Sequence, residues 1–292
     1  MTANSNLEGK NKLAFKLIAL FSNIRWYNVL LTVLAQYLSA YVIISHSGGN
    51  YWQLIYDFKL HAIILASVFS IAAGFIVNNF YDFEKDLINR PKVTLFNTLI
   101  SKNTTLNIYL IFNIIAVLIA LIASFKICIF FLVFIFSFWF YSHKIQKTPF
   151  IKEFAASILS VTSFFAIILH YAKFYPFIFV YGVFFMSLVY SRELVKQFQN
   201  YKGDMALNNS SIPVLLGFDK ARYFSIFILM LSFFFGFSIL VFFGFSIGNY
   251  FLIIALVSIF TNLFLLKYNH FRTVNLVYKI LIVLGIFNLL LI

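Results

Sequence analysis

The chain contains 292 residues, of which 62% are hydrophobic and only 11% are charged, and it carries a formal net charge of +13. Apolar runs long enough to cross a bilayer recur along its whole length. They exclude a soluble domain with one core and predict an all-α, polytopic membrane protein. The basic residues lie in the connections between these runs, so the net charge does not indicate nucleic-acid binding. The single cysteine, Cys128, excludes an intrachain disulfide.

The apolar runs predict about nine membrane-spanning helices. In chain order we expect them at Tyr27–Ile44, His61–Phe80, Thr105–Ser124, Ile127–Tyr141, Phe154–Tyr171, Phe174–Tyr190, Tyr223–Phe243, Tyr250–Leu266 and Val274–Ile292. The fourth is the shortest. Because glycine and proline are sparse, most of these spans should be continuous helices.

Nearly all of the 22 lysines and arginines fall in the N-terminal segment and in alternate connections between spans. The positive-inside rule therefore places the N-terminus and these connections in the cytoplasm, in a multi-pass protein of the inner (cytoplasmic) membrane. Of the nine acidic residues, only Asp57 falls on the outer side. The scarcity of ionisable groups within the spans argues against an ion-coupled transporter and favours a polar pocket that faces the cytoplasm.

The second span ends in a polar cluster, NNFYDFEKD at residues 78–86. If the helix continues through it, Asn78, Asp82 and Asp86 occupy successive i, i+4 positions on one face, with Asn79 beside them. Oxygen ligands at the mouth of a membrane helix suit Mg²⁺, which also binds phosphate oxygens. The alternative is a charged helix end that only marks the water interface, but ionisable groups at membrane helices are costly and usually functional.

Basic residues follow at Arg90 and Lys92, and again after the fourth span in YSHKIQK at residues 141–147. Beside a metal-binding helix, such cations suit a ligand that carries phosphates. Taken alone, each basic group is more often explained by membrane topology. His143 within the second group either touches the pocket or anchors the helix at the interface.

The connection after the sixth span, SRELVKQFQNYKGD at residues 191–204, holds a second polar cluster. Lys196, Asn200 and Asp204 repeat the i, i+4 spacing. We therefore expect one domain over residues 1–292, built from duplicated halves near 20–145 and 150–292 with facing polar mouths. The alternative for the second cluster is a solvated interfacial helix. After it, SIPVLLG at residues 211–217 predicts a re-entry turn.

Together these motifs resemble the UbiA superfamily of intramembrane prenyltransferases, and the resemblance covers nearly the entire chain. The family's NDxxDxxxD motif is similar to residues 78–86, and its Arg-Pro feature to Asn89-Arg90-Pro91. Its RPxN element is similar to residues 25–28 without the proline, and its YSxxLK loop to residues 141–147. Its RExxKDxxDxxGD motif with a following Leu-Pro resembles residues 192–204 and then Ile212-Pro213.

The resemblance implies a nine-helix bundle that binds a prenyl diphosphate through Mg²⁺ and passes the prenyl group to a lipid-soluble acceptor among the membrane lipids. It implies metal ligation by Asn78, Asn79, Asp82, Asp86, Asn200 and Asp204, of which Asn78, Asp82 and Asp86 are catalytic. It implies substrate binding by Arg25, Asn28, Arg90, Lys92, Tyr141, Ser142, Lys144, Arg192 and Lys196. The RExxK form is closest to the branch that alkylates geranylgeranylglyceryl phosphate, although quinone and chlorophyll branches share much of it.

Three positions depart from the family pattern: Asn79, Gln197 and Asn200 stand where the family has aspartates. The prediction is an active enzyme whose acceptor is a glycerol-phosphate ether lipid or an aromatic quinone precursor. The alternatives are a degenerate, non-catalytic isoprenoid-binding relative and a small-molecule carrier.

Overall fold

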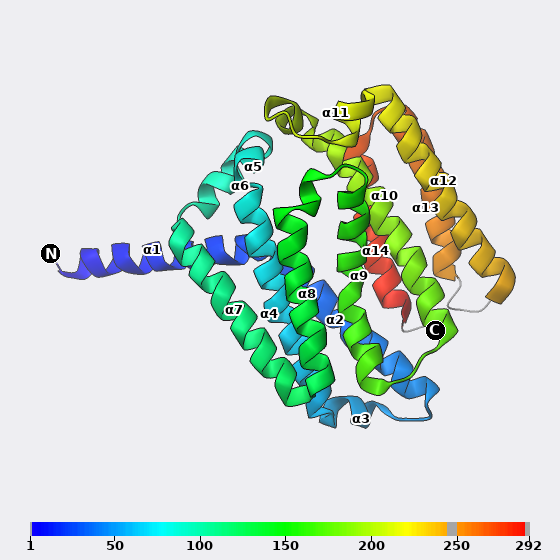
Figure 1. Ribbon diagram of the computed structural model, residues 1–292, viewed down its shortest axis with the longest axis horizontal. Helices are drawn as coiled ribbons and strands as arrows, with labels where there is room; N and C mark the ends of the chain where they lie inside the picture. The colour runs from blue at the N-terminus through cyan, green and yellow to red at the C-terminus, as the bar shows by residue number, and fades with distance from the viewer. Residues whose placement is uncertain (1, 244–249, 290–292) are drawn as a thin grey trace. The chain divides into compact units, whose positions relative to one another are not determined.

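The computed structural model describes residues 2–243 and 250–289, and all regular secondary structure in this part of the chain is helical (Figure 1). The helices before residue 144 are α1 Thr2–Asn23, α2 Trp26–His46, α3 Tyr51–Tyr56, α4 Phe58–Tyr81, α5 Phe83–Asn89, α6 Pro91–Asn97, α7 Lys102–Ala123 and α8 Phe125–His143. Those after it are η1 Ile145–Lys147, α9 Ile151–Tyr171, α10 Pro176–Ala206, α11 Ile212–Leu216, α12 Phe218–Phe243, α13 Tyr250–Lys267 and α14 Phe271–Asn288.

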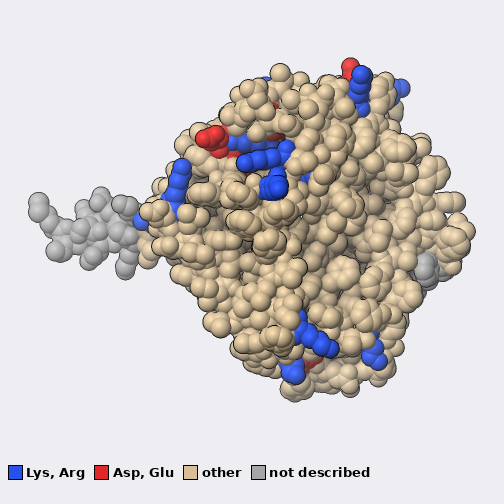
Figure 2. Space-filling view, viewed as in Figure 1, with Lys and Arg blue, Asp and Glu red and all other residues tan. Residues whose placement is uncertain are grey.

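Eight described helices are long and apolar enough to cross a membrane: α2, α4, α7, α8, α9, α10, α12 and α14. The all-α polytopic class is therefore confirmed. The span predicted at Tyr250–Leu266 falls on α13, a shorter apolar helix, so the count of nine stays a prediction. Residues 290–292 of the last predicted span lie outside the described residues. On the face shown in Figure 2, charged side chains form a few small groups and leave most of the surface uncharged, as lipid contact requires.

One sequence interpretation is wrong: residues 191–204 are not a connection but the second half of α10, which runs unbroken for 31 residues. At 1.5 Å per residue this helix is about 46 Å long, well beyond the ~30 Å hydrocarbon core. The polar half of α10 therefore extends out of the apolar layer as a helix. The predicted i, i+4 face of Lys196, Asn200 and Asp204 lies within this continuous helix.

The chain divides into two compact units, Met1–Val33 with His61–His143 and Leu34–Leu60 with Lys144–Ile292. In the first unit α7 packs along α8, and α5 packs on α6. The close contact between α4 and α8 depends on Gly74 of α4, where a Cβ atom would lie 2.8 Å from the Phe138 ring of α8. Only glycine permits that approach without displacing the ring.

In the second unit α10 is the helix on which the others assemble, because it packs against α9, α11, α12 and α14. Its apolar half contributes Phe184 and Leu188 to a core that Tyr278 and Leu281 of α14 complete. Within its polar half, the ring of Phe198 stacks on Phe271 with centroids 4.4 Å apart. The second polar cluster is therefore carried on the best-packed helix of this unit.

Candidate active site

The first polar cluster lies where α4 ends and α5 begins. Asp82 is the single residue between the two helices, with φ −85° and ψ 2°. The backbone bonds from Asp82 N to Asn78 O (2.9 Å) and from Asp86 N to Asp82 O (2.8 Å) nevertheless keep the helical register. The Asn78 amide donates to Asp82 Oδ2 over 3.0 Å, so the side chains predicted to share a face do meet. The Asn78 and Asp82 side chains thus meet despite the break in the helix. Asp86 follows in the same helical register, and of these three residues it alone lines the pocket described below.

Asn79 makes different contacts from those of Asn78 and Asp82. Its amide nitrogen donates to the backbone oxygen of Asn23 (2.8 Å) and to Asn23 Oδ1 (3.2 Å). Its Oδ1 accepts a bond from Arg25 Nη2 at 3.2 Å. The Arg25 guanidinium also lies 5.2 Å from the centroid of the Phe75 ring. Asn79 therefore holds the entry to α2 and the Arg25 side chain, and its metal-binding role stays a prediction.

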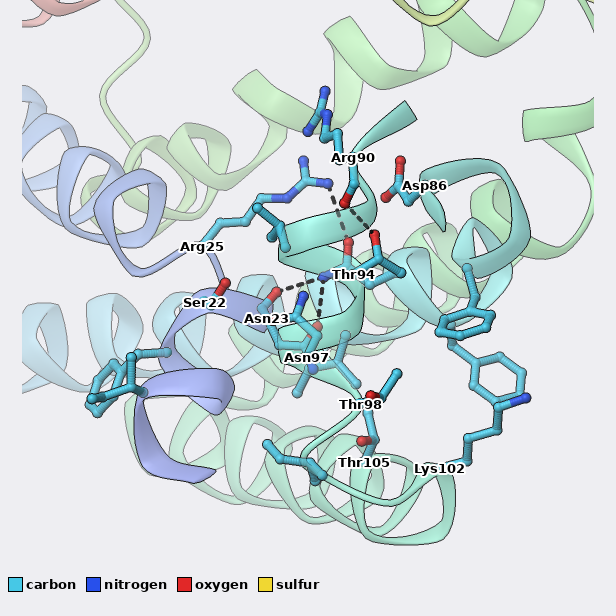
Figure 3. A pocket seen from close by; sticks show the side chains of 18 of the residues that line it. Ser22, Asn23, Arg25, Asp86, Arg90, Thr94, Asn97, Thr98, Lys102 and Thr105 are labelled. Atoms are coloured by element: carbon cyan, nitrogen blue, oxygen red, sulfur yellow. Dashed lines mark hydrogen bonds between the residues drawn. The ribbon is translucent and has the colours of Figure 1, made fainter. Parts of the chain in front are cut away.

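A pocket of about 720 Å³ opens beside this cluster, within the first unit (Figure 3). This volume is in the range of pockets that hold small molecules. Arg25, Arg90 and Asp86 line one side of it, whereas Thr98, Lys102 and Thr105 lie on the other. Its apolar walls come from Ile18, Phe21, Trp26, Tyr27, Ile76, Phe80, Phe83, Val93 and Ile100. A ligand with an anionic head and an apolar tail would match both surfaces.

The electrostatics of the cluster favour a cation. Burial raises the pKa of Asp86, and the negative charge of Asp82 raises it further, against the opposing effects of Arg90, Arg25 and Lys85. Two carboxylates that disfavour each other's charge are stabilised by a shared divalent ion. Mg²⁺ is commonly bound by one or two carboxylates together with substrate phosphates, so this donor set fits the predicted cofactor.

The remaining predicted residues of the first half do not line the pocket, and they differ in burial. Asn28 is half-buried in the first turn of α2, while Lys92 is exposed on α6 and does not line the pocket. Tyr141 is half-buried, and the buried Ser142 hydroxyl has no hydrogen-bond partner among the described residues. Lys144 follows α8 at the start of the second unit, where it precedes η1.

His143 is an anchor between helix ends. Its Nδ1 lies 3.0 Å from the Tyr81 hydroxyl at the end of α4, and its ring stacks on Trp139 at 5.2 Å. This favours the anchoring interpretation of the two that the sequence left open. Through Tyr81 it fixes the helix end immediately before Asp82.

The second polar cluster is held by ion pairs and amide bonds within the second unit. Lys196 Nζ donates to Glu193 Oε2 at 2.6 Å, and Arg192 lies 3.7 Å from the same carboxylate. Arg192 also donates to Asn275 of α14 (3.1 Å), which in turn donates to Gln199 (3.1 Å). The two cations predicted to bind substrate therefore already neutralise Glu193 in this state.

The two predicted metal ligands of the second cluster differ in burial. Asp204 is fully buried and Asn200 is half-buried. Over residues 2–243 and 250–289, no group of three or more His, Cys, Asp or Glu side chains is arranged to hold a metal ion. A single aspartate on this helix fits Mg²⁺ less well than the Asp82 and Asp86 pair does.

Sequence reasoning missed Glu153 and Asn275 as members of the second cluster, and it did not predict the partner of Gln197. Glu153 is only 3% exposed, in the first turn of α9, and it accepts a hydrogen bond from Gln197 of α10. A carboxylate on an apolar helix is energetically costly and usually has a role. Glu153 could therefore have been singled out from the sequence on this ground. Asn275 had no such signal, because one amide at a helix start is unremarkable.

Comparison with known proteins decides the family. Residues 29–279 match the sequence profile of the UbiA prenyltransferase family. The chain belongs to the UbiA prenyltransferase family. It is therefore a multi-pass integral membrane enzyme that transfers prenyl groups.

Named relatives and solved structures agree with this assignment. The chain is 25% identical over 252 residues to digeranylgeranylglyceryl phosphate synthase of Sulfurisphaera tokodaii, covering 82% of this chain and 86% of that one. It is 27% identical over 166 residues to the enzyme of the same name from Thermococcus gammatolerans, covering 56% of this chain and 59% of that relative.

Two solved structures share the fold. A structure of a digeranylgeranylglyceryl phosphate synthase aligns with a TM-score of 0.67 at 23% identity, covering 94% of this chain and 96% of that one. A UbiA homologue from Archaeoglobus fulgidus bound to GPP and Mg²⁺ also aligns with a TM-score of 0.67, at 13% identity over 94% of this chain and 100% of that one.

Proposed function

We propose that this UbiA-family chain transfers an isoprenyl group from an allylic prenyl diphosphate to a lipid-soluble acceptor, with Mg²⁺ as cofactor. The observation that carries the proposal is the meeting of carboxylates, arginines and an apolar wall in one unit. Asp86 lines the pocket together with Arg25 and Arg90, and Asp82 is close enough to raise the pKa of Asp86. A prenyl diphosphate presents the complementary chemistry, an anionic head and an apolar tail.

Asp82 and Asp86, with Asn78 hydrogen-bonded to Asp82, would hold Mg²⁺. Bound there, the ion would neutralise the charge that the diphosphate gains as its bond to the prenyl group breaks. Binding of GPP and Mg²⁺ by the Archaeoglobus fulgidus homologue supports this choice of donor and cofactor.

The arginines would act directly on the leaving group. As the allylic C–O bond breaks, its electron pair leaves with the diphosphate, and Arg25 and Arg90 would stabilise that charge. The allylic carbon then forms a bond to the acceptor, whose displaced proton passes to water or to the released diphosphate. Asn79 and the Phe75 ring hold Arg25 beforehand, so little rearrangement is needed when the charge develops.

A glycerol-phosphate ether lipid is the first acceptor to consider, because the relatives from Sulfurisphaera tokodaii and Thermococcus gammatolerans are digeranylgeranylglyceryl phosphate synthases. An aromatic quinone precursor is the second. The first carries a phosphate and the second does not, so the two can be separated by their products.

The test is mass spectrometry of products after purified protein in nanodiscs is mixed with Mg²⁺, a panel of prenyl diphosphates and each acceptor class. The expected product is a prenylated glycerol-phosphate ether lipid. A prenylated quinone precursor alone would reassign the acceptor. Donor that binds but is recovered intact with every acceptor would show a non-catalytic isoprenoid-binding protein. Uptake of an unchanged solute into proteoliposomes, without chemistry, would show a carrier.

A further inference from the structure

The C-terminal half of α1 exposes large apolar side chains along one stripe of the helix. Leu13, Leu17 and Phe21 repeat at i, i+4 spacing and are 62%, 49% and 54% exposed. A different side of the helix packs: Ala19 is fully buried, Asn23 is buried, and α1 contacts α6. This half of α1 therefore contacts the first unit through small and polar side chains and turns its apolar stripe (Leu13, Leu17 and Phe21) away from it.

The same half of α1 lies where the spans of the first unit leave the bilayer. Only Ile24 and Arg25 separate it from the span α2, and Arg25 takes a left-handed turn conformation with φ +49°. Phe21 lines the same pocket as Lys102, which begins the span α7, and Phe80, near the end of the span α4. Because span ends mark the edge of the hydrocarbon core, α1 is held at that edge. From there it runs sideways from the other helices of the first unit (Figure 1).

The charge of α1 suits this location. Its sequence holds Lys10, Lys12 and Lys16 against one acidic residue, Glu8. Lys16 is exposed and lies within the same turns as the apolar stripe. Helices that lie on a membrane surface combine these features, because apolar side chains enter the acyl region while lysines attract anionic headgroups. In bulk water the apolar stripe would stay hydrated, which is unfavourable.

We propose that the C-terminal half of α1 lies in the plane of the membrane surface, with its apolar stripe among the acyl chains and Lys16 among anionic headgroups. Ile18 and Phe21 are each 54% exposed and also line the pocket, so they belong to both surfaces. An amphiphile in the leaflet can therefore enter the pocket over α1 with its tail on apolar side chains. The inference concerns where α1 lies and does not depend on the proposed function.

Nitroxide spin labels on the full-length chain measure the depth of each side of α1. With Cys128→Ala as background, a label is placed at Leu17→Cys on the apolar stripe or at the neighbouring exposed Lys16→Cys. Ile114→Cys, exposed in the middle of α7, is the reference for the acyl core. The nanodiscs contain phosphatidylcholine with or without phosphatidylglycerol. We expect the Leu17 label to be accessible to oxygen, like the Ile114 label, and the Lys16 label to be accessible to a water-soluble nickel complex. Removal of phosphatidylglycerol should shift the Leu17 label towards water.

High nickel accessibility of the Leu17 label would place α1 in water and overturn the proposal. Protection of that label from both oxygen and nickel would also overturn it, because protein would then cover the stripe; dipolar broadening between labels would identify a second copy of the chain. An equal depth in both lipid mixtures would contradict the role given to anionic headgroups. If Leu17→Cys disturbs α1, Leu13→Cys on the same stripe decides by the same readings. None of these measurements needs turnover, so they stand or fall separately from the proposed function.

Discussion

At the scale of single residues, the first cluster separates side chains that the sequence groups together. Asn78 contacts Asp82, whereas Asn79, one position later, contacts Arg25 and Asn23. Adjacent helical residues point about 100° apart, so neighbours in a motif need not share a ligand. The metal roles of Asn78 and Asn79 both stay predictions, and the contacts of the two residues differ.

Replacement of Asn79 by alanine tests this difference. The change removes the acceptor of Arg25 and the donor to Asn23, so Arg25 should lose its preferred position. A hydrogen bond to a charged group contributes about 1.5–3 kcal/mol, which corresponds to a rise in KM for the prenyl diphosphate of about tenfold or more. Steady-state kinetics at saturating Mg²⁺ measure it. A shift in the Mg²⁺ requirement with unchanged KM would identify Asn79 as a metal ligand instead.

At the scale of helices, packing in the second unit depends on small residues at defined positions. A Cβ atom on Gly285 of α14 would lie 2.1 Å from the Phe185 ring, whereas one on Gly182 of α10 would meet nothing within 4 Å. Gly285→Ala should therefore lower stability by about 1–3 kcal/mol through overpacking. The matched change Gly182→Ala should be neutral or stabilising by up to about 1 kcal/mol, because alanine favours helix. Thermal unfolding in detergent measures both, and equal effects would refute this packing.

A second prediction at this scale concerns the junction of α3 and α4. Burial acts to raise the pKa of Asp57, but bonds from His170, the Leu60 N–H and Tyr171 outweigh it and lower the pKa. A lowered carboxyl pKa stabilises the fold above the ordinary pKa, and this stability is lost as pH falls through the folded-state pKa. Thermal stability should therefore fall more steeply below about pH 4 than it does in Asp57→Asn. Parallel curves for the two proteins in differential scanning fluorimetry would show that Asp57 contributes nothing there.

The features that depend on the periodicity of the sequence were predicted correctly. Those that depend on contacts between residues far apart in the chain were not. The i, i+4 spacing of Asn78 and Asp82 was enough to bring their side chains together, and the apolar runs gave the spans. The polar half of α10 was predicted to be a connection, because its composition resembles that of a loop. It is helical because α10 continues beyond the length that crosses the hydrocarbon core. From the sequence, Gln197 was only a departure from the family pattern, because the contact with Glu153 is visible only in the fold.

At the scale of the whole molecule, the distribution of basic residues predicts which ends of the helices face the cytoplasm. A cysteine placed at Lys147 or Lys202 should be protected from a membrane-impermeant thiol reagent in intact cells. One placed at Asn50 should be labelled readily, and the buried Cys128 should give a low background. Labelling in permeabilised cells controls for access. The reverse pattern would place both polar clusters on the outer face.

We propose that Asp82 and Asp86 bind the cation that serves the diphosphate. The most direct test of this proposal is the Mg²⁺ dependence of diphosphate release by the unaltered protein, Asp82→Asn, Asp86→Asn and the control Glu84→Gln, in which an exposed carboxylate of the same turn is neutralised outside the pocket. We predict that either aspartate variant lowers the rate at least a hundredfold or needs far more Mg²⁺, because electrostatic stabilisation of the leaving group contributes about 3 kcal/mol or more. Glu84→Gln should retain the Mg²⁺ dependence of the unaltered protein. Release by both aspartate variants at the unaltered rate and Mg²⁺ concentration would contradict the claim.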